Sequence, residues 1–166
     1  MPYTVFMLEG RAVAGMGSLT PAGMQEGQPP VCSPYVMVDD IEVTTPRAKE
    51  LGAVLLTEPM AIADAGSVFV ASDPIGSAIS VWQADQHDRA GVFNVPGARS
   101  WNELACRDVS GAKRLYTELL GWGIDVQQHA DFTYTVVKVG DRWRRSLLAT
   151  VTIPRQNGGT QLEELL

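Results

Sequence analysis

The segment VSGAKRLYTELLGW (109–122) organises this chain, because it contains the clearest helix in the sequence. Asp108 stands where an N-cap acid is favoured, and Gly121 stands where helices commonly end. The apolar residues between them recur every three or four positions, as on the buried side of an amphipathic helix: Val109, Ala112, Leu115, Tyr116, Leu119 and Leu120. The pattern predicts a helix over 109–120.

This helix belongs to a unit that occurs twice. In the later copy, NELACRD (102–108) precedes the helix and YTVVKVGDRWRRSLLA (134–149) follows it. In the earlier copy, PYVMVDD (34–40) precedes a helical stretch that ends at ELG (50–52), and FVASDPIGSAISVW (69–82) follows. Each unit is too small to bury its own apolar faces, so we expect the two copies to pack against each other.

Each unit is expected to run strand, helix and three strands. The earlier unit is predicted to hold a strand over 34–38, a helix over 41–51, strands over 54–57, 68–71 and 78–82, and a loop over 59–66. The later unit is predicted to hold strands over 100–106, 123–128, 133–139 and 143–150 around its helix. Asp39-Asp40 offers the cap of the first helix, and Pro46 is interpreted as a first-turn proline. SDPIG (72–76) supplies the turn between two strands.

Outside the two units, YTVFMLEGRAVAGMGS (3–18) looks like the final hairpin of a preceding copy, turning at Glu9-Gly10. An uncovered strand edge invites pairing, so we expect a homodimer. The tail is expected to fray or to form a short helix over 160–166. The predicted organisation is a remnant hairpin at 1–18, a linker at 19–32, a module at 33–84, a linker at 85–99, a module at 100–150 and a tail at 151–166.

Composition excludes several classes of function. The chain has 166 residues and 45% hydrophobic content, which suits one globular domain with a core. Its net charge is −6, and its densest basic cluster is Arg142, Arg144 and Arg145, so nucleic-acid binding is not expected. No signal peptide is expected, and no apolar run approaches the roughly 20 residues of a membrane helix. Two cysteines, Cys32 and Cys106, fit a reduced cytoplasmic setting.

The unit order, the helix starts VDD (38–40) and RD (107–108), the helix end LYTELLGW (115–122) and the turn SDPIG (72–76) together resemble the vicinal-oxygen-chelate superfamily. This is the glyoxalase and bleomycin-resistance group. The resemblance covers about residues 3–150 and extends to actinobacterial glyoxalase-like proteins with four modules. Relative to those, the chain is expected to begin inside the first module and to lack the fourth. The resemblance implies an α+β fold, in which paired βαβββ modules form curled mixed sheets around a cleft, with helices outside.

Strand alternation then assigns side chains to faces. Val36, Val38, Ile79, Val81, Leu104 and Cys106 are expected on the helix side. The residues expected in the cleft are Ser33, Tyr35, Met37, Ala78, Ser80, Trp82, Trp101, Glu103 and Ala105.

The resemblance also implies where a metal would be bound, on the first and last strands of each module. The matching positions here carry Ser33, Ser80 and Trp101, with a fourth near Arg144. None of these side chains is a usual first-row metal ligand. His87 and His129 have no ligand-like spacing and are interpreted as surface residues. We therefore expect a metal-free member without a cofactor, which disfavours glyoxalase-type isomerisation and ring-cleaving oxygenation.

The remaining site is a cleft with aromatic walls. Tyr35, Met37, Trp82 and Trp101 offer apolar surface, and Ser80, Asn102 and Glu103 offer hydrogen bonds, which suits a planar or amphipathic small molecule. Glu103 is the candidate catalytic residue, because desolvation in an enclosed cleft would raise its pKa and make it a general base or a ligand anchor. The alternatives are that the aromatic residues fill space between the sheets and that Glu103 is a solvated rim residue or pairs with the arginines of 142–145.

Three functions stay open. The first is a metal-independent binding protein for a small, partly aromatic compound, as in drug-sequestering members of the superfamily. The second is a lyase, isomerase or hydrolase that uses Glu103 as its base. The third is a truncated remnant whose modules serve only assembly. The sequence leaves open whether the chain is an enzyme.

Overall fold

The structure is a computed structural model, which describes residues 3–19, 21–25, 27, 30–86, 91–106, 108–128, 133–139 and 148–152. Several predicted features lie outside these residues: the tail helix over 160–166, the 143–147 part of the last predicted strand, His87, His129, Arg142, Arg144 and Arg145.

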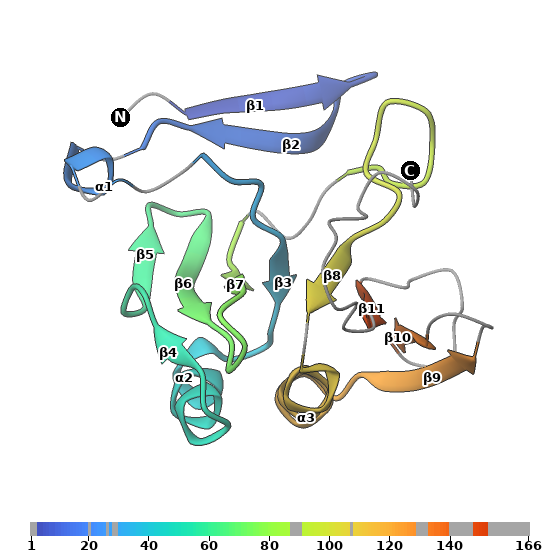
Figure 1. Ribbon diagram of the computed structural model, residues 1–166. Coiled ribbons are helices and arrows are strands. Elements are labelled where there is room, and N and C mark those ends of the chain that lie inside the picture. Colours follow the sequence, from blue (N-terminus) through green and yellow to red (C-terminus); the bar gives the residue numbers. More distant parts are fainter. Residues whose placement is uncertain are drawn as a thin grey trace.

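Two copies of one topological unit make up most of the described chain (Figure 1). The first contains β3 (Tyr35–Met37), α2 (Ile41–Glu50), β4 (Val54–Leu55), β5 (Met60–Ile62), β6 (Gly66–Ser72) and β7 (Ala78–Ala84). The second contains β8 (Glu103–Cys106), α3 (Val109–Leu120), β9 (Gly123–Gln128), β10 (Thr133–Lys138) and β11 (Leu148–Thr152). The sheet orders are β3-β7-β6-β4 and β8-β11-β10-β9, and in each the first strand pairs in parallel with the last. The sheets are therefore mixed, as expected.

The predicted helix caps are confirmed. Asp40 Oδ1 accepts hydrogen bonds from the backbone N–H groups of Glu42 and Val43 at 2.9 and 3.1 Å. Asp108 Oδ1 accepts one from Gly111 N–H at 3.0 Å, and α3 ends at Gly121, which adopts the left-handed conformation.

The interpretation of Pro46 was wrong, because this residue is the sixth of α2 and lies beyond the first turn. Proline has no N–H for the carbonyl four residues earlier, so a position inside the helix costs backbone bonding. The buried residues Ile41, Thr45 and Ala48 pack α2 against the sheet, and this packing offsets the cost.

Two other local predictions were also wrong. The predicted loop over 59–66 contains β5, which pairs antiparallel with the start of β6. Gly66 makes this close return possible, because its φ is 156° and an added Cβ would meet the Trp82 ring. The predicted linker at 19–32 contains the short helix α1 (Pro21–Gln25). Both elements were missed because Pro59 and Pro21 were interpreted as loop signals.

The core lies on one face of each sheet, which we call the helix face, and it continues from one module to the other. Phe69 of β6 and Leu115 of α3 are both 0% exposed and belong to the same hydrophobic cluster. The six residues predicted for the helix side all belong to this cluster or pack against it. Figure 1 shows α2 and α3 beneath the sheets, and Arg47 of α2 and Glu118 of α3 form an ion pair of 2.8 Å.

The hairpin of β1 (Tyr3–Leu8) and β2 (Arg11–Gly17) forms a two-stranded sheet of its own at the opposite end of the molecule from α2 and α3 (Figure 1). Gly91 N–H donates to the Ala12 carbonyl at 2.8 Å, which ties the hairpin to the segment between the modules. Tyr3, Val5, Phe6, Met7 and Met16 are exposed on it. Within the described parts of the chain, the helices are too short or too polar to cross a membrane.

Candidate functional site

A cavity of about 350 Å³ lies between the first strands of the two modules. The first module contributes Pro34, Tyr35, Val36 and residues 77–79 to its lining, and the second contributes residues 101–104, Tyr116 and Trp122. Cys32 and Arg99, from the segments that precede each module, complete the lining. This volume falls within the range of small-molecule sites. The cavity is therefore built by the pairing of two modules, and neither module forms it alone.

Four of the predicted site residues, Tyr35, Trp101, Asn102 and Glu103, line this cavity together. Tyr35 belongs to β3 and is 60% exposed, and Trp101 is 45% exposed. Trp101 and Asn102 come directly before β8 and are not part of the strand, as the predicted range 100–106 had placed them. The cavity thus has an aromatic residue from each module and two polar residues beside them.

The other three predicted site residues, Met37, Ser80 and Trp82, are not among the residues that line the cavity. Trp82 packs edge-on against Tyr35, with ring centroids 6.3 Å apart. Ser80 is 1% exposed, and its hydroxyl is 2.8 Å from that of Ser33. Met37 stands opposite Trp82 on neighbouring strands. Ser80 and Trp82 thus lie beside Tyr35 on the neighbouring strand β7, and Trp82 contacts its ring.

A chain of hydrogen bonds joins Trp101 to Glu103 through Tyr134 of β10. The Trp101 indole N–H donates to the Tyr134 hydroxyl at 3.2 Å, and that hydroxyl donates to Glu103 Oε2 at 3.0 Å. Burial raises the pKa of Tyr134, and the nearby Glu103 carboxylate raises it further, whereas the Trp101 bond lowers it. Tyr134 therefore keeps its proton near neutral pH and orients both neighbours.

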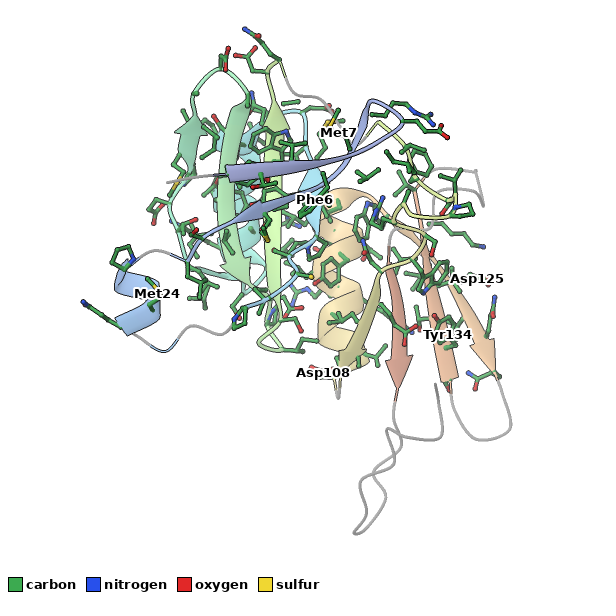
Figure 2. The ribbon with its side chains drawn as sticks, turned by 90° about the horizontal axis from the view of Figure 1, so that it is seen from above. Phe6, Met7, Met24, Asp108, Asp125 and Tyr134 are labelled. Carbon is green, nitrogen blue, oxygen red and sulfur yellow. The ribbon has the colours of Figure 1, made fainter. Side chains whose placement is uncertain are left out.

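Tyr134 was not among the site residues predicted from the sequence. Strand alternation could have located it. Val137 faces the core, and Tyr134 lies three positions earlier on the same strand, so Tyr134 faces the opposite side, which Glu103 also occupies. Figure 2 shows Tyr134 on the second sheet, away from the hairpin that carries Phe6 and Met7.

Two aromatic residues of the cavity lining are fixed by one contact within the second module and one between the modules. Tyr116 of α3 stacks on Trp122, with ring centroids 5.7 Å apart, and both residues line the cavity. The Tyr116 hydroxyl donates to the buried Asp73 Oδ2 at 3.0 Å. Asp73 Oδ1 in turn accepts from Ile75 N–H and Ser77 N–H, at 3.1 and 2.7 Å. The SDPIG turn, predicted only as a turn, thus also joins the first module to the helix of the second.

Glu103 is more open to solvent than the sequence analysis expected. It is exposed, so the described residues do not supply the enclosure on which the expected desolvation depends. Cys106 faces the core as predicted, and burial raises the pKa of its thiol, with Asp73 and Asp108 raising it further.

The residues at the expected metal positions do not fit a metal ion. Ser33 and Ser80 bond to each other, and Trp101 Nε1 donates to Tyr134, so none of the three offers an anionic or imidazole ligand. Across the part of the chain that the structure describes, no three His, Cys, Asp or Glu side chains come together as a metal-binding group. The fourth expected position, near Arg144, lies outside that part.

Comparison with curated proteins gives relatives in actinobacteria, although no family model matches the chain. The chain is 32% identical over 140 residues to CFP32 of Mycobacterium tuberculosis, which carries a provisional glyoxylase name, and the match covers 84% of this chain and 53% of that protein. It is 30% identical over 129 residues to the anthracycline biosynthesis protein DnrV of Streptomyces peucetius, covering 72% of this chain and 47% of that protein. The chain therefore spans about half the length of the curated relatives it matches.

A solved structure supports the fold independently. The Mn(II)-bound glyoxalase from Novosphingobium aromaticivorans superimposes with a TM-score of 0.55 at 17% identity, covering 72% of this chain and 42% of that one. At this level of identity the likeness concerns the fold alone.

Proposed function

Because the chain belongs to the vicinal-oxygen-chelate superfamily, the glyoxalase, bleomycin-resistance and dioxygenase group, we propose that its inter-module cavity binds a small, partly aromatic molecule without a metal ion. The observation that carries the proposal is the lining of this cavity, where Tyr35 and Trp101 stand beside Asn102 and Glu103. Aromatic surface supplies affinity for a planar compound, and a few polar groups set its orientation.

Two further observations support an aromatic ligand. The cavity lining also includes the stacked rings of Tyr116 and Trp122. The name of one relative places that protein in the biosynthesis of anthracyclines, which are polycyclic aromatic compounds. Metal independence rests on the donor set at the expected ligand positions, which consists of hydroxyls and an indole.

Calorimetric titration with a panel of aromatic compounds, in the presence of a chelator, tests this function. We expect saturable binding that Trp101→Ala weakens by about tenfold, since an aromatic contact contributes about 0.5–1.5 kcal/mol beyond the apolar area it buries. Phe6→Ala is the matched control, because Phe6 is 46% exposed on the hairpin and Trp101 is 45% exposed at the cavity. Absence of binding across the panel, or binding that requires an added divalent metal, would contradict the proposal.

The second candidate is a lyase, isomerase or hydrolase with Glu103 as general base, and the observation that favours it is the Tyr134–Glu103 hydrogen bond beside the cavity. The Tyr134 hydroxyl bonds one oxygen of the Glu103 carboxylate and orients the group. The other carboxylate oxygen takes no part in this bond and could accept a proton from a bound molecule. An activity screen comparing the native chain with Glu103→Gln tests it. Equal rates in the two proteins, or loss of activity on chelation, would remove this mechanism.

A further inference from the structure

One cationic residue, Arg99, lines the cavity, and it was not among the residues predicted from the sequence. Arg99 is the single Lys or Arg among the residues that line the cavity in the described chain. It comes two residues before Trp101, in the segment that connects the modules. Its backbone carbonyl accepts from Asn94 N–H at 2.9 Å, and Ala98 N–H donates to the Val95 carbonyl at 3.0 Å. These two bonds define the local path of the chain from which the guanidinium extends.

Every described arginine except Arg99 has an acidic partner. Arg11, Arg47 and Arg114 form ion pairs with glutamates at distances between 2.8 and 3.6 Å. Glu103, the acidic residue that lines the same cavity, is bonded to the Tyr134 hydroxyl and lies beyond ion-pair distance of Arg99. Within the described residues Arg99 therefore has no ion pair, and it lines the cavity together with the aromatic residues Tyr35 and Trp101. A guanidinium in this setting matches a carboxylate, which it can bind through two parallel N–H donors.

We propose that the cavity selects aromatic carboxylates, with Arg99 binding the carboxylate and the rings of Tyr35 and Trp101 contacting the aromatic body. Glu103 then accepts a hydrogen bond from a hydroxyl or amino group elsewhere on the ligand. This inference rests on the proposed function, because it names the chemical class of the molecule that the cavity binds. The net charge of −6 repels anions from the molecule as a whole, so recognition of an anion depends on this local cation.

The test compares para-hydroxybenzoate with its neutral isostere, para-hydroxybenzamide, by calorimetry on the full chain at low ionic strength. We expect the native chain to bind the carboxylate about tenfold more tightly than the amide. Arg99→Gln should bind the two compounds equally, and Arg99→Lys should retain part of the preference, because an ammonium attracts the carboxylate without the bidentate fork. Arg114→Gln is the control for loss of one positive charge, since Arg114 pairs with Glu118 on α3, outside the cavity lining. It should keep the full preference.

A carboxylate-to-amide ratio that is the same in the native chain and in Arg99→Gln would overturn this inference. Naphthol, a neutral aromatic probe, separates that result from failure of the proposed function. If naphthol binds in a manner that Trp101→Ala weakens while the carboxylate has no advantage, the inference fails and the proposed function stands. If none of the three compounds binds, both fail.

Discussion

The strands β3 and β8 occupy the same place in their modules, at one edge of a sheet and parallel to its last strand. Toward the helix face both present an aliphatic residue, Val36 in β3 and Leu104 in β8, which packs against the common core. Toward the other face they differ, because β3 presents the aromatic Tyr35 and β8 presents the acidic Glu103. The modules therefore share their topology and an aliphatic residue at this position, Val36 or Leu104, but they differ in the residue on the other face.

This difference indicates which residues determine the fold and which can determine function. Burial constrains the helix face, where a polar substitution would cost free energy in either module. Tyr35 and Glu103 on the other face are both exposed and under no such constraint, so an aromatic residue and a carboxylate can stand at equivalent positions. The cavity between β3 and β8 combines the two chemistries. The predictions that follow separate the shared part of this comparison from the differing part.

The largest expected effect concerns the shared core. Phe69→Ala should lower the free energy of unfolding by about 3–5 kcal/mol, because it leaves a cavity in a cluster to which both modules contribute. Denaturant unfolding followed by circular dichroism measures this, and one cooperative transition is expected. The control Phe93→Ala, at an exposed position between the modules, should change stability by about 0.5 kcal/mol or less. Two separate transitions would show that the modules do not share a core, and would favour an assembly remnant.

The next effect concerns the contact between the modules. Tyr116→Phe should cost about 1–3 kcal/mol near neutral pH, because it leaves the buried Asp73 Oδ2 without its donor. Burial and the nearby Asp73 raise the pKa of Tyr116 above its ordinary value of 10.0. The folded chain therefore holds this proton more tightly than the unfolded chain. The stabilisation is complete below about pH 10 and declines as the pH rises further.

Thermal melts of the native chain and Tyr116→Phe across this pH range measure the difference. The difference in stability between the native chain and Tyr116→Phe should be constant up to about pH 10 and become smaller above it. Tyr3→Phe, which alters an exposed tyrosine of the hairpin, is the control. A native advantage that grows with alkaline pH would contradict the assignment.

A smaller effect is expected where the modules differ. Tyr134→Phe removes the bonds to Trp101 and Glu103 and should weaken ligand binding severalfold, while stability falls by about 0.5–1.5 kcal/mol. Thr133→Val is the matched control on the same strand, because the Thr133 hydroxyl donates to Gln128 at 2.9 Å, at residues that do not line the cavity. Calorimetry measures the ligand affinity of both variants, and only Tyr134→Phe should bind more weakly than the native chain. Equal affinities would mean that orientation of Trp101 and Glu103 is irrelevant to binding.

The smallest effect on the fold concerns the hairpin. We propose that a second copy of the chain covers the apolar side chains of β1 and β2, since an isolated two-stranded sheet gains little stability by itself. Val5→Lys should convert a homodimer to monomers in sedimentation velocity, with little change in circular dichroism. Val54→Lys, at an exposed position of β4, should leave the dimer intact. A native chain that sediments as a monomer would refute the proposal.

The parts of the molecule that the sequence predicted are those that local physics determines. Capping acids and helix periodicity located α2 and α3, and alternation placed Val36, Ile79 and Leu104 on the helix face. These signals need only near neighbours along the chain. The family resemblance supplied the arrangement of the units, and the relatives at 32% and 30% identity confirm the superfamily.

The parts that escaped prediction depend on contacts between distant segments. Arg99 lies in a linker, and only the pairing of the modules brings it beside Tyr35. Asp73 has the sequence signature of a turn residue, and its bond to Tyr116 spans 43 positions. No local pattern reports such contacts, so alternation alone could not distinguish the cavity residue Tyr35 from Met37 and Trp82.

Fluorine NMR of the chain with its four tryptophans replaced by 5-fluorotryptophan tests the central claim most directly. Single Trp→Phe variants assign the resonances, and para-hydroxybenzoate and naphthol serve as titrants. If the ligand binds between β3 and β8, the resonances of Trp101 and Trp122, which line the cavity, should shift together and saturate at one concentration. A compound that binds while the Trp101 resonance stays fixed would contradict the account.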